Sequence, residues 1–164
     1  MKFKKNVVLS VLMSLSLLIG FFSMFHSTSI EVYSEDNKVH SVPTNNKVTY
    51  VFVWSSTCGS CVYNLSDINL LKQRVEELGG KFLLVLSEDK LILRQMGKAS
   101  CIRLNLEDLE SFYDKDQVLQ KKFRINVVPT LLIFSKNGKM VKRIEGAVPW
   151  GENGNMQEAL EFLN

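Results

Sequence analysis

The sequence predicts an α/β domain with a mixed central sheet, preceded by an N-terminal apolar segment. Two β-rich apolar runs, Lys47–Trp54 and Lys81–Ser87, flank a stretch whose apolar residues have helical spacing. This order is typical of a strand–helix–strand unit with parallel, buried strands. Near the C-terminus, the turn pair Asn137–Gly138 joins two further strand-like runs and predicts an antiparallel hairpin.

The helix after the first strand is predicted from apolar side chains three or four residues apart. They are Leu65, Ile68, Leu71, Val75 and Leu78. The pair Gly79–Gly80 predicts its end. The pattern is weaker after the second strand, where we expect helices over residues 88–97 and 116–123 and a short strand over residues 101–106.

The last third of the chain is predicted to form the hairpin and a final helix. The hairpin strands are expected over 130–135 and 139–145. The apolar residues of the helix are Met156, Ala159, Leu160 and Leu163. Asn155, followed three residues later by Glu158, predicts a capped helix start.

The N-terminal segment is predicted to enter a membrane. Val7 to Phe25 contains no charged residue, and 19 helical residues span about 28 Å, close to the thickness of a bilayer core. The lysines ahead of it are Lys2, Lys4 and Lys5. They predict a cytoplasmic N-terminus and a translocated remainder. We therefore expect a signal-anchor or signal peptide over 1–25, a linker over 26–46 and a domain over 47–164; cleavage near Ser29 would instead give a secreted protein.

The charge balance argues against nucleic acid as a partner. The net charge is +3, but without the three N-terminal lysines the chain has 17 basic and 17 acidic residues. Contact with phosphates requires a clustered excess of positive charge. Nucleic acid is therefore not expected as a partner.

The residues that indicate chemistry are Cys58-Gly59-Ser60-Cys61, placed where a strand leads into a helix. The N–H groups and partial positive charge of a helix N-terminus favour a thiolate. Cys58 is the predicted nucleophile, and Cys61 would displace whatever Cys58 captures. A purely structural disulfide stays open as an alternative. So does a zinc site completed by Cys101 and His40.

Three segments resemble the thioredoxin superfamily. Residues 53–61, from Val53 through the CxxC motif, resemble its active-site segment. Val128-Pro129-Thr130 is similar to its second signature, a cis-proline loop before a strand, and residues 134–139 with Gly146 resemble its terminal hairpin. With the N-terminal apolar segment, the chain most resembles the TlpA/ResA-like branch of membrane-associated thiol–disulfide oxidoreductases.

The resemblance implies a thioredoxin-like fold and a role for each matching residue. Cys58 would attack and Cys61 resolve, forming a redox-active Cys58–Cys61 disulfide. Pro129 would be cis and lie opposite the dithiol, the backbone of Val128 would pair with an extended substrate, and Trp54 would flank the site. No cofactor or metal is implied. Cys101 is expected to be a buried, inert thiol.

The sequence departs from the family pattern at several positions. Thr57 replaces the usual Trp before the first cysteine, Ser60 a common Pro, and Ser66 a helix-kinking Pro. Phe52 stands where thioredoxins bury an Asp, which leaves Glu88 or Asp89 as possible proton acceptors for Cys61. These changes affect redox potential and efficiency rather than reaction class.

The expected function is disulfide exchange with exported client proteins, outside the cytoplasm. Reduction of client disulfides, for example in cytochrome c maturation, is the leading role implied by the resemblance. A membrane or envelope redox partner would restore the dithiol. Oxidative disulfide formation and copper handling by the two thiolates are the alternatives.

Overall fold

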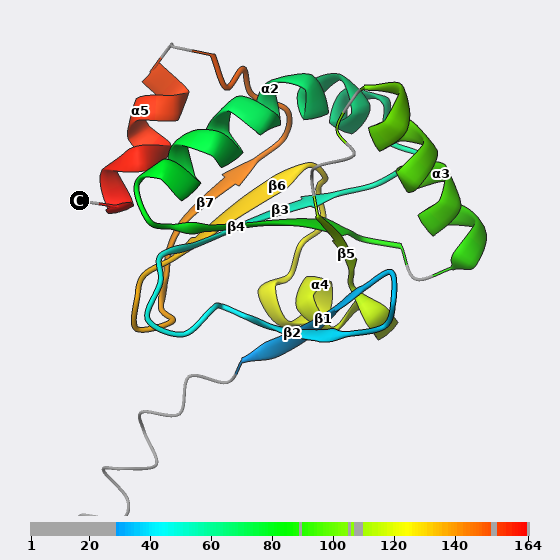
Figure 1. The fold of residues 1–164 in the computed structure, drawn as a ribbon, viewed down its shortest axis with the longest axis horizontal. Helices are drawn as coiled ribbons and strands as arrows, with labels where there is room; N and C mark the ends of the chain where they lie inside the picture. The colour runs from blue at the N-terminus through cyan, green and yellow to red at the C-terminus, as the bar shows by residue number, and fades with distance from the viewer. Residues whose placement is uncertain (1–28, 89, 105, 107–109, 152–153, 164) are drawn as a thin grey trace, which may run out of the picture.

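The computed structural model describes residues 29–163, apart from residues 89, 105, 107–109 and 152–153. It shows one seven-stranded sheet with helices on both faces (Figure 1). The strands are β1 (Ile30–Ser34), β2 (Val39–Val42), β3 (Thr49–Trp54), β4 (Lys81–Leu86), β5 (Ser111–Tyr113), β6 (Thr130–Phe134) and β7 (Met140–Glu145). The helices are α2 (Gly59–Glu77), α3 (Leu91–Arg103), α4 (Val118–Phe123) and α5 (Gly154–Leu160), with 3-10 turns η1 (Lys115–Gln117) and η2 (Glu161–Leu163).

The sheet is mixed, as predicted. Its strand order is β2-β1-β5-β4-β3-β6-β7. Strands β3, β4 and β5 are parallel, whereas β6 pairs antiparallel with both β3 and β7. The strand–helix–strand unit and the C-terminal hairpin therefore both lie at the predicted positions in the chain. The pairing of β3 with β6 joins the unit to the hairpin in one sheet.

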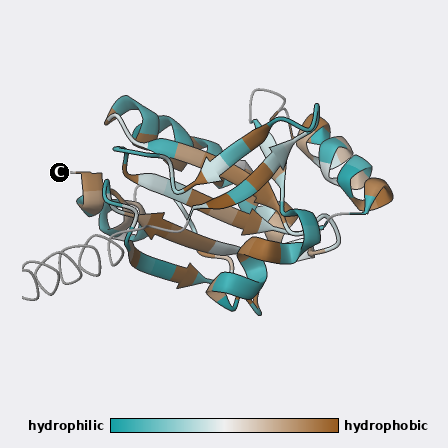
Figure 2. Cartoon of the chain, turned by 90° about the horizontal axis from the view of Figure 1, so that it is seen from below, coloured by the Kyte–Doolittle hydropathy of each residue, from teal (hydrophilic) through white to brown (hydrophobic). Residues whose placement is uncertain are grey.

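Strands β3, β4 and β6 are apolar after their first residue because both of their faces are covered. Every residue of β3 is buried, and its side chains alternate between two hydrophobic clusters. Tyr50, Phe52 and Trp54 belong to the cluster with α2, α3 and α5, whereas Val51 and Val53 belong to the cluster with α4. Figure 2 shows hydrophobic residues along strands in the middle of the molecule. A strand buried on both faces loses the alternation of polar and apolar residues.

The segment predicted as a linker over 26–46 contains two strands of the sheet, so that prediction was wrong for residues 30–42. β1 pairs antiparallel with both β2 and β5. Ile30, Val32 and Ser34 point inward, and the residues between them are more exposed. This period-two pattern is hard to recognise in the sequence because it is short and includes a serine. Since β1 and β2 are part of the sheet, the domain begins at Ile30 rather than at Lys47.

The expected strand over 101–106 was also wrong. Cys101 lies in α3, which starts at Leu91 and continues to Arg103. The strand that pairs with β4 is β5, which begins ten residues later. A Cβ on Gly97 would lie 3.2 Å from Leu86, so this glycine permits α3 to pack closely on the sheet. The cap predicted at Asn155 was wrong as well, because Asn155 lies inside α5.

A buried carboxylate holds the start of α4. Asp114 is fully buried, and its two oxygens accept hydrogen bonds of 2.9 Å from the backbone N–H groups of Leu119 and Gln120. Burial raises the pKa of Asp114 from its ordinary value of 3.8, although these hydrogen bonds oppose the shift. Asp114 therefore satisfies two backbone N–H groups in the first turn of α4, and its ionisation is less favourable in the folded chain than in water.

We expect Asp114→Asn to lower the free energy of unfolding by about 1–2 kcal/mol, because the amide offers only one acceptor. The folded chain binds the Asp114 proton more tightly than the unfolded chain. The wild type therefore loses stability relative to the variant as pH rises above 3.8. Urea unfolding of both proteins across a pH series measures this, and a wild-type advantage that grows with pH would contradict it.

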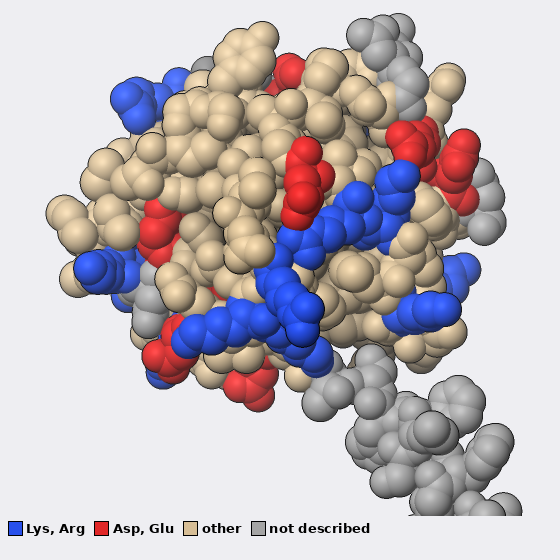
Figure 3. All heavy atoms as spheres, turned by 180° about the vertical axis from the view of Figure 1, so that it is seen from behind, with Lys and Arg blue, Asp and Glu red and all other residues tan. Residues whose placement is uncertain are grey.

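Basic side chains gather on the face that carries α4 and β7 (Figure 3). The Arg143 guanidinium donates to the backbone oxygens of Phe123 at 2.6 Å and Arg124 at 3.0 Å. These carbonyls lie at the C-terminal end of α4, where a positive charge is favourable. Arg143 therefore ties the end of α4 to β7, and part of this basic surface serves the fold.

Candidate active site

The CxxC motif lies at the junction of β3 and α2. Cys58 is the N-cap of α2, with extended backbone angles. Its backbone oxygen accepts a 3.1 Å hydrogen bond from the N–H of Val62, and its sulfur accepts one of 3.1 Å from the N–H of Cys61. The sulfur thus takes the place of the oxygen of an ordinary capping residue. Negative charge on this sulfur would be stabilised by the same N–H group.

Cys58 and Cys61 form a disulfide, with their Cα atoms 5.2 Å apart. Cys58 is partly exposed, whereas Cys61 is fully buried. The Ser60 hydroxyl lies 3.3 Å from the Cys58 sulfur and can donate to it. Only the first cysteine of the pair is therefore accessible to another protein.

The loop before Cys58 is held by Glu88, which follows β4. Its Oε1 atom accepts a 2.5 Å hydrogen bond from the Ser55 hydroxyl and a 2.9 Å bond from the Ser56 N–H. The same oxygen accepts from the Ser56 hydroxyl at 3.2 Å. Glu88 thus fixes the backbone that carries Cys58. Its Oε1 atom is engaged by this loop, while Asp89, the other acceptor considered for Cys61, lies outside the described residues.

The loop before β6 approaches the disulfide. The Val128–Pro129 peptide is cis, as the resemblance implied. The Cys58 sulfur lies 3.6 Å from the backbone oxygen of Val128. Pro129 is buried, and its carbonyl accepts a 2.8 Å hydrogen bond from the N–H of Gly146. Residues 70 positions apart in the chain are therefore brought together at the exposed sulfur.

Trp54 lies beneath the site rather than on its surface. It is fully buried in the cluster that includes Cys61 and Leu65. Its ring edge lies 3.5 Å from the position that a Cβ on Gly97 would occupy. Trp54 therefore supports the active-site helix and α3 from inside, and an exposed role beside Cys58 is not open to it.

The sequence analysis missed Asn64, one turn after Cys61. This side chain is buried. Its amide donates to the backbone oxygen of Val148 at 2.6 Å, and its oxygen accepts from the indole N–H of Trp150 at 3.1 Å. Asn64 thereby attaches the segment after β7 to the active-site helix. No local signal marks this role, since the partners lie more than 80 residues away.

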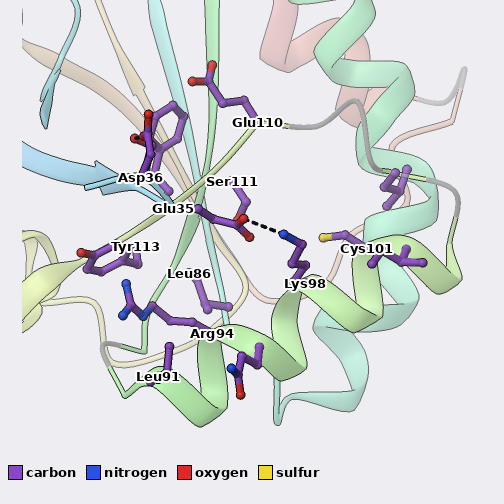
Figure 4. A pocket seen from close by; sticks show the side chains of 15 residues that line it. Glu35, Asp36, Leu86, Leu91, Arg94, Lys98, Cys101, Glu110, Ser111 and Tyr113 are labelled. Carbon is purple, nitrogen blue, oxygen red and sulfur yellow. Dashed lines mark hydrogen bonds and ion pairs between the residues drawn. The ribbon is translucent and has the colours of Figure 1, made fainter. Parts of the chain in front are cut away.

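Cys101 lies in a different part of the molecule. It is buried, is not part of a disulfide, and lines a cavity of about 690 Å³ between α3 and strands β1 and β5 (Figure 4). His40 lies on β2, with its ring 4.6 Å from that of Phe112. The zinc site considered from the sequence therefore lacks its two additional ligands. Within the described residues, no group of three or more His, Cys, Asp or Glu side chains is arranged to hold a metal.

The apolar run over residues 7–25 lies outside the described residues. Among those that are described, no helix is long and apolar enough to cross a bilayer. The membrane anchor predicted from the sequence therefore stays a prediction.

Solved structures with the same fold cover most of this chain. StoA from Bacillus subtilis superposes with a TM-score of 0.68 at 16% identity, covering 84% of this chain and 98% of StoA. A protein described as the thiol:disulfide interchange protein DsbE, from Chlorobium tepidum, gives 0.71 at 17% identity, with coverage of 84% and 95%. The exposed lipoprotein thioredoxin Etrx1 from Streptococcus pneumoniae gives 0.65 at 21% identity, with coverage of 83% and 98%.

At the level of sequence, no curated protein matches the chain significantly. A protein family does match: the thioredoxin-like domain, over residues 35–162. The match contains the disulfide, the cis-proline loop and the hairpin described above. The chain is thus a member of the thioredoxin-like domain family, and its CxxC pair makes it an oxidoreductase of the thiol–disulfide class.

Proposed function

We propose that this protein exchanges disulfides with exported client proteins on the outer side of a membrane, chiefly as a reductant. The observation that carries the proposal is the placement of one partly exposed sulfur, that of Cys58, 3.6 Å from the backbone oxygen of Val128. An extended client segment that hydrogen-bonds to this backbone would bring its own disulfide to the Cys58 sulfur.

The reaction starts from the reduced protein. The Cys58 thiolate attacks one sulfur of a client disulfide, a mixed disulfide forms, and the client's other sulfur leaves as a thiolate that takes up a proton. Cys61 then loses its proton and attacks the Cys58 sulfur. The second client thiol is released, and the Cys58–Cys61 disulfide forms. The client gains two electrons, the protein loses two, and a dithiol partner of the envelope must return them.

The location outside the cytoplasm is supported by the N-terminal apolar run with its preceding lysines. A protein of the same fold, Etrx1, is described as an exposed lipoprotein. Cytochrome c maturation is one process that requires reduced client cysteines of this kind. Oxidation of clients is the same chemistry in reverse, and a redox titration of the Cys58–Cys61 pair against a glutathione buffer would decide the direction.

The test is to change the resolving cysteine. In Cys61→Ser, Cys58 can still capture a client but cannot be released by its neighbour, so mixed disulfides should accumulate on a non-reducing gel and disappear when a reductant is added.

We expect iodoacetamide to label Cys58 of the reduced protein faster than a model thiol at mildly acidic pH, because a helix N-terminus favours the thiolate.

The control is Cys58→Ser combined with Cys61→Ser, which lacks both thiols. It should yield no adducts. Adducts that persist in this double variant would involve Cys101, and a folded Cys61→Ser protein without Cys58-dependent adducts would refute the proposed function.

A further inference from the structure

Helix α3 packs against the sheet with its small residues and presents its large apolar residues to the outside. The buried residues of the helix are Gly97, Ser100 and Cys101. The large exposed ones are Leu91, Ile92, Met96 and Ile102, with exposed fractions of 62%, 61%, 45% and 49%. A surface helix of a soluble domain normally has the opposite arrangement. Together with the exposed Gln95 and Ala99, these four residues form the α3 outer face, of which Leu91 and Ile102 also border the cavity beside the helix.

The charged residues of α3 itself are all basic, whereas Glu35, Asp36 and Glu110 line the cavity beside Leu91 and Ile102. Residues 91–103 contain Arg94, Lys98 and Arg103 and no acidic residue, and Lys90 is the N-cap. In Figure 4, Arg94 and Lys98 extend from the side of the helix that borders the cavity. A helix that combines exposed apolar residues with charged residues that are all lysine or arginine is typical of helices that lie on an anionic membrane surface.

Two of these basic residues have partners on the sheet. Arg94 stacks on the ring of Tyr113 at 4.1 Å, and Lys98 pairs with Glu35 at 2.7 Å. The pair with Glu35 is exposed and weak. Lys90 and Arg103 are exposed at the two ends of the helix. They remain available to anionic headgroups while the apolar residues between them meet the lipid.

The length of chain between the N-terminal apolar run and α3 permits this contact. Phe25 ends the apolar run and Ile30 begins β1, and five extended residues reach at most about 18 Å. β1 adds about 17 Å, and Glu35, the residue after it, contacts Lys98 in the middle of α3. A domain attached at Ile30 is thus held close enough to a bilayer for α3 to reach its surface.

We propose that the α3 outer face binds the surface of a bilayer containing anionic phospholipid and thereby orients the domain on the membrane. The inference rests on the membrane attachment included in the proposed function, but not on the redox chemistry. Leu91, Ile92, Met96 and Ile102 enter the boundary between headgroups and acyl chains, and Lys90 and Arg103 contact the phosphates.

The experiment places a tryptophan on the α3 outer face. The full-length Met96→Trp variant is reconstituted in bilayers of phosphatidylcholine and phosphatidylglycerol, with and without brominated acyl chains. The two native tryptophans are buried, so their emission is measured in the wild type and subtracted. We expect the emission of the new indole to fall to roughly half in brominated bilayers, since such helices lie about 5–10 Å deep.

The matched control is Leu78→Trp, because Leu78 is similarly exposed, at 52%, but lies at the end of α2. Its emission should not respond to bromine. Replacing phosphatidylglycerol by phosphatidylcholine should weaken the quenching of Met96→Trp, since the basic residues lose their anionic partners. An equal loss of emission in brominated bilayers for Met96→Trp and Leu78→Trp would overturn the proposal. So would a blue-shifted but unquenched Met96→Trp indole, which would indicate a protein partner or a second copy.

The disulfide reductase activity of the same Met96→Trp sample separates the two proposals. An active sample without bromine quenching refutes the membrane contact alone. An inactive wild type with intact quenching of Met96→Trp refutes the proposed function alone.

Discussion

Replacing Cys58 by Ser is expected to lower the rate of disulfide reduction by at least about 10³-fold, because no other described sulfur can take its place. Cys61 is fully buried in the first turn of α2, so it cannot approach a protein disulfide. The assay is insulin reduction by the protein in the presence of a small dithiol, followed by turbidity and corrected for the rate of the dithiol alone.

The matched variant is Cys101→Ser. Cys101 lines the cavity beside α3, whereas Cys58 lies at the β3–α2 junction beside Val128. We expect Cys101→Ser to retain the wild-type rate within about twofold, even if the polar hydroxyl lowers stability by roughly 1–3 kcal/mol. A similar loss of rate in both variants would mean that the site does not work through Cys58.

The largest effect on stability is expected for Asn64→Leu. The leucine has a similar size but neither donates nor accepts, so the buried N–H of Trp150 and the backbone oxygen of Val148 lose their partner. Leaving these groups unsatisfied should cost about 2–4 kcal/mol in the free energy of unfolding. Urea unfolding followed by circular dichroism measures the change.

Gln73→Leu is the control, since Gln73 is an exposed residue of the same helix. It should change the free energy of unfolding by less than about 0.5 kcal/mol. If Asn64→Leu is no less stable than Gln73→Leu, the hydrogen bonds between α2 and the segment after β7 do not contribute as described.

The parts of the fold that sequence reasoning predicted well are those with strong local signals. The continuous apolar runs of β3, β4 and β6 reflect burial on both faces, and the Asn137–Gly138 pair marks the turn between β6 and β7. The CxxC motif and Pro129 were also recognised locally. Their proximity in the fold could be expected only through the family resemblance, because 70 residues separate Cys58 from Val128.

The errors occurred where burial does not follow hydrophobicity. In α3 the buried face consists of glycine, serine and cysteine while the large apolar residues are outside, so the spacing of apolar residues located the helix poorly. In β1, the buried positions include Ser34, so the alternation of polar and apolar residues that predicts a strand is incomplete. Glu88 and Asn64 contribute through partners far away in the chain, and residue type alone does not reveal such hydrogen bonds.

The two outermost strands limit how copies of this protein can associate. β2 is only four residues long and is followed by Pro43, which has no N–H to offer, while β7 includes Lys142, Arg143 and Glu145. Edge strands that are short or charged discourage strand pairing between molecules of the type seen in amyloid. If the domain is attached to a membrane as proposed, neighbouring copies would meet at high local density, and such edge strands would help keep them from aggregating.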